Sequence, residues 1–328
     1  MITISVCMIV KNEEKILARC LDSLKGIADE IIIVDTGSTD KTKEIAAKYT
    51  DRIYDYVWIQ DFADARNESF SHATCDYIYQ ADADEVIDEE NRQKFLRLKE
   101  VLLPEIDIVQ MNYCGQLDHG TVYNFDREYR PKLFKRLRTF TWQDPVHESV
   151  RLMPVVYDSD IDILHMPENI HSGRDFGIFQ KMQEEGRVMS KKLHHMYAQE
   201  LMISGTDADI AASEPTFLAT FCDETKGLDE HMDACCVLAR CYRTLKRFEE
   251  FFKYALKAVS SGGCSEVCYE LGMYYYEKMD YEEAKIWFCN AISNTEPILS
   301  LRVQTELAPS MLEKTENRIN GSPDRWCI

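Results

Sequence analysis

The sequence lacks any apolar run near the roughly 20 residues that a membrane-spanning helix needs, so no membrane span is expected. It also lacks a Cys-x-x-Cys spacing among its 12 cysteines, which are scattered and often lie in apolar periodic segments. Such cysteines are typical of buried thiols in a reducing compartment. Met1 leads directly into a β-rich run, which does not resemble a signal peptide. These absences predict a soluble, cytoplasmic protein.

Positive charge is scarce, with 38 Lys and Arg residues against 57 Asp and Glu and a formal net charge of -19. A polyanion would be repelled over most of such a surface, which argues against nucleic acid or anionic lipid as the main partner. The dense basic cluster before residue 170 is the segment 130–138 (RPKLFKRLR). It indicates either a solvated strand and loop or a patch that faces a diphosphate or an anionic acceptor.

The chain of 328 residues is longer than one hydrophobic core usually organises, so two domains are expected. The first hundred residues alternate β-rich runs with amphipathic helical stretches, which predicts an α/β domain with an open, three-layered parallel sheet. Expected strands are residues 3–10, 30–35, 52–57, 76–80, 106–113, 131–134 and 161–165, and expected helices are residues 13–24 and 39–49.

After residue 174 the pattern is helical, with no convincing strand. The pattern Leu238-Ala239-x-x-Tyr242 recurs 33 residues later as Leu271-Gly272-x-x-Tyr275. This period is similar to that of the tetratricopeptide repeat, whose small residues let paired helices approach closely. An unrelated helical bundle with chance spacing is the alternative. Stacked helix pairs would offer either a protein-binding groove or an interface for a homodimer.

Clustered carboxylates follow the apolar strand at residues 76–80 as Asp82-Ala83-Asp84-Glu85. Ligands of open α/β sheets bind outside the carboxyl ends of the strands, which is where these acids are expected. A divalent cation held by one or two carboxylates keeps coordination positions for the oxygens of a nucleotide diphosphate. The alternative is that the acids complement the dipole of a following helix.

Two more strand ends carry polar groups. Asp35 ends a buried strand, where a carboxylate can accept hydrogen bonds from a ribose hydroxyl or a base N–H. Asn12 and Glu13 follow the first strand, whereas Asp40 is better explained as a cap of the next helix. Three strand ends therefore converge on one edge of the sheet, which favours a nucleotide-binding site.

Five blocks in this order and spacing resemble the family 2 glycosyltransferases of the GT-A fold, specifically the cytosolic branch with a C-terminal tetratricopeptide-like extension. The blocks are residues 8–14 (MIVKNEE), 33–40 (IVDTGSTD), 61–67 (DFADARN), 82–85 (DADE) and 146–148 (VHE). Some bacterial peptide S-glycosyltransferases share the two-part layout and form one candidate subgroup. The resemblance implies a Rossmann-like, nucleotide-diphospho-sugar transferase domain at residues 1–170, a helical region at 171–230 and tetratricopeptide-like repeats at 231–328.

The resemblance also implies roles for individual residues. Asp35 would contact the nucleoside, Asp82 the ribose or the metal, and Asp84 a Mg²⁺ or Mn²⁺ ion that bridges the diphosphate. Arg66 would lie near the phosphates, unless it forms a surface ion pair with Asp64 or Glu68. The remaining residues of the expected nucleotide-sugar site are Val10, Asn12, Glu13 and Ala83.

The catalytic base and a further metal ligand are expected after residue 140. Glu148 is the candidate base, and Asp144 is its rival because this chain has Asp144-Pro145 where the family usually has Gly. His165 ends a strand where this group often has a His next to the metal or diphosphate, and His171 is the substitute.

Together these features predict an inverting transfer of a hexose from a UDP-sugar to a peptide or protein side chain or to a glycan. One alternative is a non-catalytic interaction scaffold with a relic transferase domain. The other alternative is a nucleotidyltransferase. Such an enzyme would need a Gly-rich phosphate-binding loop with a basic residue after the first strand, and residues 10–14 lack one.

Overall fold

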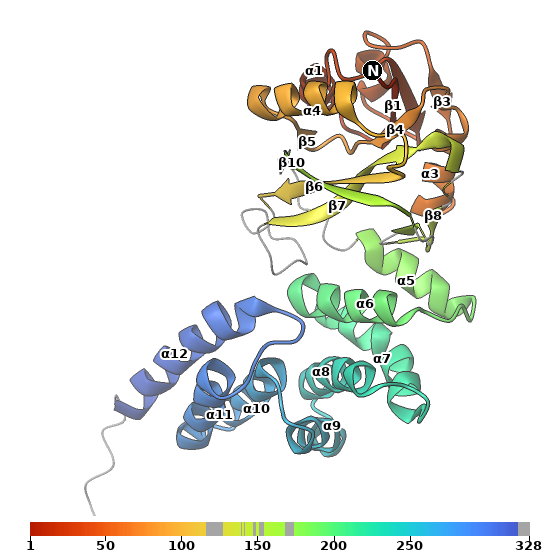
Figure 1. Ribbon diagram of the computed structural model, residues 1–328. Coiled ribbons are helices and arrows are strands. Elements are labelled where there is room, and N and C mark those ends of the chain that lie inside the picture. The colour runs from red at the N-terminus through yellow and green to blue at the C-terminus, as the bar shows by residue number, and fades with distance from the viewer. Residues whose placement is uncertain are drawn as a thin grey trace, which may run out of the picture. The chain divides into compact units, whose positions relative to one another are not determined.

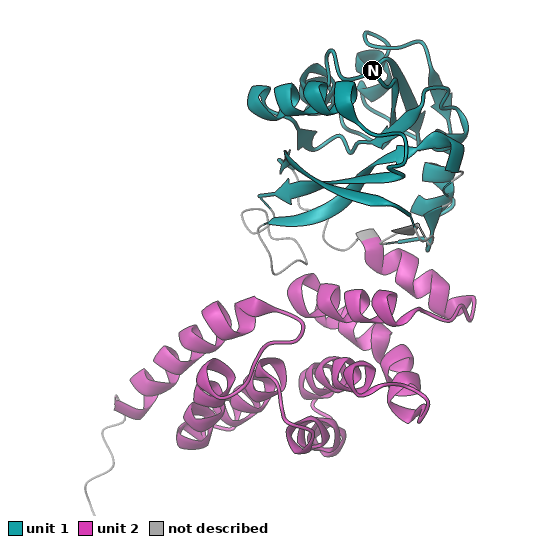
Figure 2. Ribbon diagram, in the orientation of Figure 1, with its two compact units in different colours: residues 1–171 teal, residues 172–328 magenta. Residues whose placement is uncertain are grey.

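The computed structural model describes residues 1–115, 127–138, 140, 142–146, 149–150, 154–167 and 174–320. The chain divides into two compact units, residues 1–171 and 172–328 (Figure 2). The first is an α/β unit and the second is helical (Figure 1). A helical region was expected at residues 171–230, between the two domains. Its helices within residues 174–222 fall in the second unit.

The first unit is organised by an eight-stranded sheet of order β3-β2-β1-β4-β7-β6-β10-β5. Its strands are β1 (Ile4–Val10), β2 (Glu30–Asp35), β3 (Ile53–Asp55), β4 (Tyr77–Gln80), β5 (Glu85–Val86), β6 (Ile108–Cys114), β7 (Arg127–Lys135) and β10 (Val156–His165).

The prediction of a parallel sheet holds for β1 to β4 and is wrong for β7 and β5. β7 lies antiparallel between β4 and β6, and β5 pairs antiparallel with β10. An apolar or alternating run specifies which face each residue occupies but carries no information about strand direction, which only pairing decides.

Helices cover both faces of this sheet. They are α1 (Leu17–Ser23), α2 (Thr42–Ala46), α3 (Phe62–Ser71) and α4 (Glu89–Val101), and a short hairpin pairs β8 (Trp142–Gln143) with β9 (Ser149–Val150). The helix expected from residue 13 begins only at Leu17, because Asn12 has a φ of 57° and the chain turns there. Asp61 and Asp88 cap α3 and α4 by accepting from the backbone N–H groups of Asp64 and Asn91.

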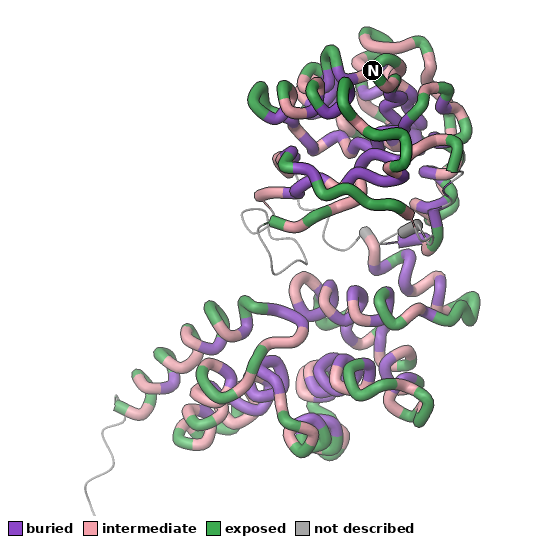
Figure 3. The backbone as a smooth tube through the Cα atoms, viewed as in Figure 1, coloured by how far each residue is buried: buried purple, intermediate pink, exposed green. Residues whose placement is uncertain are grey.

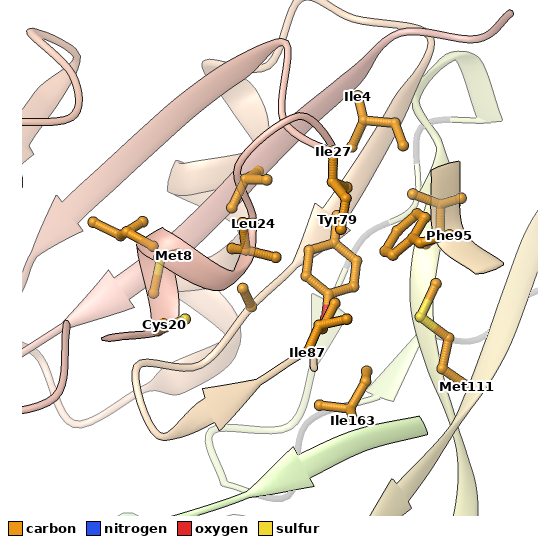
Figure 4. Close-up of a cluster of buried hydrophobic side chains, with 14 of the residues drawn as sticks. Ile4, Met8, Cys20, Leu24, Ile27, Tyr79, Ile87, Phe95, Met111 and Ile163 are labelled. Atoms are coloured by element: carbon orange, nitrogen blue, oxygen red, sulfur yellow. The ribbon is translucent and has the colours of Figure 1, made fainter. Parts of the chain in front are cut away.

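The core follows from the alternation of side chains along β1. Met8 points to the face covered by α1 and α4, where Cys20 and Phe95 are buried with Tyr79 (Figure 4). Cys7 points to the opposite face, which α3 covers. Buried residues accordingly run along the inner strands (Figure 3). Around β1, where helices lie on both faces, the strand ends are the place where polar groups meet solvent.

The second unit is a succession of helices. They are α5 (Arg174–Glu184), α6 (Lys191–Ser204), α7 (Asp207–Cys222), α8 (Leu228–Thr244), α9 (Phe248–Ser260), α10 (Ser265–Glu277), α11 (Tyr281–Ser293), the π-helical η3 (Val303–Leu307) and α12 (Ala308–Asn320). Within the described part of the chain, no helix is long and apolar enough to cross a membrane.

The repeated pattern lies on α8 and α10, at equivalent buried positions. Leu238 and Ala239 are fully buried in α8, and Leu271 and Gly272 are buried in α10. A Cβ atom at Gly272 would lie 2.6 Å from the Phe288 ring of α11. The repeat therefore needs a residue without a side chain there, because the two helices approach so closely.

We expect Gly272→Ala to lower the free energy of unfolding by about 1–3 kcal/mol, since the added methyl group overpacks the contact with Phe288. The matched control is Gly177→Ala in α5, where nothing lies within 4 Å of the added Cβ. That control should be neutral or stabilising by up to about 1 kcal/mol, because alanine favours helix. Urea unfolding followed by circular dichroism measures both, and equal stabilisation by the two changes would contradict the packing argument.

Candidate functional site

Asp35 ends β2 with an almost fully buried carboxylate. Its Oδ1 accepts hydrogen bonds from the backbone N–H groups of Gly37 at 3.0 Å and Ser38 at 2.8 Å. Its Oδ2 is buried and has no hydrogen-bond partner among the described residues. Leaving a buried carboxylate oxygen without a donor costs free energy. An incoming N–H or O–H group would remove that cost, so Asp35 is suited to bind a ligand.

The end of β1 forms the adjoining wall of this site. The Val10 carbonyl accepts from the Thr36 N–H at 3.0 Å, and the Asn12 Oδ1 accepts from the Thr39 N–H at 2.8 Å. The Glu13 N–H donates to the Thr42 hydroxyl at 2.7 Å. These contacts join the β1 end to the loop after Asp35, so Val10, Asn12 and Glu13 shape that loop.

Asp40 also takes part in these contacts, but the N-cap of α2 is Lys41, without a side-chain cap hydrogen bond, so Asp40 forms an Asx-turn in place of the expected cap. Its Oδ1 accepts from the Thr42 N–H at 2.9 Å in the first turn of α2, and its Oδ2 accepts from the Glu14 N–H at 3.1 Å.

Asp82 follows β4 and lies among cations. Its Oδ1 accepts from Arg66 Nη2 at 3.1 Å and from Gln80 Nε2 at 3.0 Å, and its Oδ2 lies 3.8 Å from Lys132 Nζ. Burial by itself would raise the pKa of Asp82, but Arg66 and Lys132 outweigh it and hold that pKa well below the usual range. The two cations therefore favour the ionised form of Asp82.

Arg66 is placed by α3 with little exposure to solvent. Its guanidinium carbon lies 5.4 Å from the centroid of the Trp142 ring, a cation–π distance, and the residue is 9 % exposed. The alternative of a surface ion pair with Asp64 or Glu68 is not what the structure shows, because the ion pair that forms is with Asp82.

Asp84 and His165 meet at the far side of the acidic turn, although 81 positions separate them in the sequence. The His165 Nε2 lies 3.1 Å from the Asp84 Oδ2. His165 ends β10 opposite Glu85 of β5, and its ring lies 5.2 Å from that of Tyr113. The intervening Ala83 is buried in the core, so its side chain has no part in the site.

Lys132, Gln80 and Glu85 were not predicted as site residues from the sequence. Lys132 is 2 % exposed in β7 and its Nζ lies 2.6 Å from the Glu85 Oε1 and 3.1 Å from the Gln80 Oε1. Burial raises the pKa of Glu85, and the ion pair with Lys132 opposes that rise. The available signals were a polar residue, Gln80, at the end of an apolar strand and a lysine, Lys132, next to the apolar pair Leu133-Phe134.

The remaining cations of the segment 130–138 also have protein partners. Arg130 stacks over Tyr113 at 4.0 Å, Lys135 donates to the Pro104 carbonyl, Arg136 donates to the Cys75 carbonyl, and Arg138 pairs with Asp107 at 3.2 Å. The segment is thus a set of paired residues in β7 and the following turn.

The region of the expected base is described only in part. Glu148 and His171 lie outside the described residues. Asp144 is half-buried and has a φ of 73°, the left-handed conformation that favours glycine. The following Pro145 accepts from the Phe62 N–H at 2.9 Å, at the start of the helix that carries Arg66. Although this chain has Asp144-Pro145 where the family usually has Gly, Asp144 adopts the left-handed backbone conformation that glycine favours.

Residues 5–156 match the model of glycosyl transferase family 2, and residues 233–261 and 265–296 match the tetratricopeptide repeat. These matches confirm the resemblance inferred from the sequence. The α/β unit followed by helical repeats is also the fold class that was predicted.

The chain is 28 % identical over 253 residues to the SPbeta prophage-derived glycosyltransferase SunS of Bacillus subtilis, which covers 76 % of this chain and 55 % of SunS. It is 45 % identical over 85 residues to a TPR repeat-containing protein of Synechococcus elongatus, which covers 26 % of this chain and 21 % of that protein. This chain thus spans about half of the first relative's length and about a fifth of the second's.

Among solved structures, glucosyl-3-phosphoglycerate synthase from Mycobacterium tuberculosis in complex with Mn²⁺ and UDP-glucose is similar with a TM-score of 0.42 and 16 % identity. That similarity covers 58 % of this chain and 81 % of the other.

We expect Arg66→Met to lower the free energy of unfolding by about 1–3 kcal/mol, because it leaves Asp82 without the cation at its Oδ1. The side chain of Asp82 is 33 % exposed, which keeps the loss below that of a fully buried pair. Lys25→Met, which breaks an exposed ion pair with Asp22, should cost much less. Urea unfolding of the three proteins checks this, and equal losses would show that Asp82 does not depend on Arg66.

Proposed function

We propose that this chain, which carries a family 2 glycosyltransferase domain at residues 5–156, moves a hexose from a UDP-sugar to a nucleophile, with inversion at the anomeric carbon. The acceptor would be a peptide or protein side chain or a glycan. The single observation that carries the proposal is that three groups stand at the strand ends: a buried Asp35 oxygen without a partner among the described residues, Asp82 with its two cations, and the Asp84–His165 pair.

The donor nucleoside is assigned to Asp35. Its Oδ1 is fixed by two backbone N–H groups, so the carboxylate has one orientation and its Oδ2 is available to a ribose hydroxyl or a base N–H. Pre-organisation of this kind reduces the entropy that binding costs.

A divalent cation is assigned to Asp84 and His165, whereas the ligand atoms of Asp82, Asp84 and His165 do not all lie within 4.8 Å of one another. The Asp84 Oδ2 and the His165 Nε2 are hydrogen-bonded at 3.1 Å, so these two donor atoms would both be within reach of one ion. A carboxylate oxygen with an imidazole nitrogen suits Mn²⁺ better than Mg²⁺. When bound, the ion would neutralise the negative charge that develops on the departing diphosphate.

The chain's own residues divide the remaining work. Arg66 is held by Asp82 and Trp142 in an orientation suited to anionic oxygens near Asp82. Inverting displacement also needs a carboxylate that takes the acceptor's proton as the new glycosidic bond forms and the bond to UDP breaks. That role is assigned to Glu148 or Asp144.

The helical repeats are assigned to acceptor recognition or to self-association. Paired helices with small residues at their contacts, such as Ala239 and Gly272, stack into an extended surface. The preference for a peptide or protein acceptor rests on this analogy of fold. The free thiols of the described cysteines favour a reducing, cytoplasmic location.

The proposal is tested by incubating the protein with Mn²⁺ and a panel of nucleotide sugars, with and without candidate peptides, and measuring released UDP. We expect one UDP-sugar to be turned over, and Asp84→Asn to reduce the rate by about 100-fold or more, because it removes a charged ligand of the ion. Asp160→Asn, whose side chain is 82 % exposed, should leave the rate unchanged. A folded protein that neither binds nor turns over any nucleotide sugar would sink the proposal.

The assignment of His165 predicts a change in metal preference. In His165→Asn an amide oxygen replaces the imidazole nitrogen, so the ratio of the rate with Mn²⁺ to that with Mg²⁺ should fall by about tenfold. His195→Asn is the control, since His195 pairs with Asp233 in the second unit. An unchanged ratio in His165→Asn would remove His165 from the ion's ligands.

A further inference from the structure

Lys132 is a buried cation next to the proposed site, with no role in the assignments above. β7 places it between β4 and β6, and its side chain is 3 % exposed. Its Nζ is 2.6 Å from the Glu85 Oε1, 3.1 Å from the Gln80 Oε1 and 3.8 Å from the Asp82 Oδ2. A lysine ammonium has three N–H donors, and here three acceptors surround it. Because it is enclosed, Lys132 faces the protein's own acids and not solvent.

Both hydrogen bonds of Lys132 lead on to Asp82. Lys132 donates a hydrogen bond to the amide oxygen of Gln80. The amide nitrogen of Gln80 is thereby directed to the Asp82 Oδ1, to which it donates at 3.0 Å. Lys132 also holds the Glu85 Oε1, and the other oxygen of Glu85 accepts from the Asp82 N–H at 3.3 Å. Side chain and backbone of Asp82 are thus fixed through two separate routes that start at one ammonium.

The charges in this turn need Lys132 as well. Asp82, Asp84 and Glu85 place three carboxylates within four residues, and Glu85 is 2 % exposed. Arg66 lies at the Oδ1 of Asp82, whereas Lys132 lies on the side of the Oδ2. Without Lys132 the buried Glu85 would lose its cation beside Asp82, which is unfavourable for the ionised form of Glu85.

We propose that Lys132 is a positioning residue for the transfer reaction, which holds Asp82, and through the turn at residues 82–85 also Asp84, in the orientation that receives the nucleotide sugar and its divalent ion. It acts through Gln80 and Glu85 and does not contact the donor. The inference rests on the proposed function. Residues that orient groups around a metal site commonly change metal affinity by about 10- to 100-fold when they are removed.

A purely structural role for a buried lysine has a counterpart in the same unit. Lys99 is 4 % exposed, pairs with Asp29 at 2.5 Å and donates to the Ile27 carbonyl at 2.9 Å. None of these partners belongs to the proposed site. Lys99 therefore separates the effect of losing a buried ion pair from the effect of misplacing Asp82.

The experiment compares wild type, Lys132→Met, the double variant Lys132→Met/Glu85→Gln and Lys99→Met. UDP binding in the presence of Mn²⁺ is measured by calorimetry, and thermal unfolding gives the stability of each protein. We expect Lys132→Met to weaken Mn²⁺-dependent UDP binding by about 10- to 100-fold. The double variant should recover thermal stability, because the unpaired buried charge is gone, but should still bind weakly. Lys99→Met should unfold at a lower temperature and bind UDP as wild type does.

The outcomes distinguish this inference from the function on which it rests. Wild type that binds no UDP with Mn²⁺ overturns the proposed function and this inference with it. If wild type binds UDP and Lys132→Met binds it equally well, only the positioning role falls. If the double variant recovers binding together with stability, Lys132 merely compensates the charge of Glu85, and the positioning role is again overturned.

Discussion

The negative charge of Asp82, enclosed between two cations, is the constraint on which the arrangement of the site depends. A carboxylate at the end of a buried strand loses hydration, and here Arg66 and Lys132 replace it from opposite sides. Each cation comes from a different element, α3 and β7, so both elements must be in place around the turn after β4 before the charge is compensated. The pairing of β7 with β4 therefore also serves the electrostatics of the site.

Asp82 and Asp35, two carboxylates at this edge of the sheet, are stabilised in different ways. Asp82 has its charge compensated within the protein, whereas Asp35 has one oxygen bound to backbone N–H groups and one buried oxygen without a described partner. The cations hold the carboxylate of Asp82 in a fixed place. The Oδ2 of Asp35, by contrast, is a buried acceptor to which a ligand can donate a hydrogen bond. In the proposed function this difference separates the acid that organises the diphosphate end from the acid that recognises the nucleoside.

Much of the fold was predictable because its signals are local. The runs that became β1, β2 and β4 are apolar and end in polar residues, and the repeat of Leu238-Ala239 as Leu271-Gly272 gave the helical unit. The direction of β7 and β5 was not predictable, since a strand pattern is the same read in either direction of pairing. The helix after β1 began late because Asn12 and Glu13 bind the loop at residues 38–42, a contact between separate segments.

By itself, the sequence determined which acids stand at strand ends, because a buried strand running into Asp35 or into Asp82-Ala83-Asp84 is a continuous pattern. Only the tertiary structure decided what those acids contact. His165 reaches Asp84 across 81 positions, and Lys132 reaches Gln80 across 52. Such partners come from strand order and register, and the sequence of a strand does not indicate which residue will pair with its charged side chain when water is excluded.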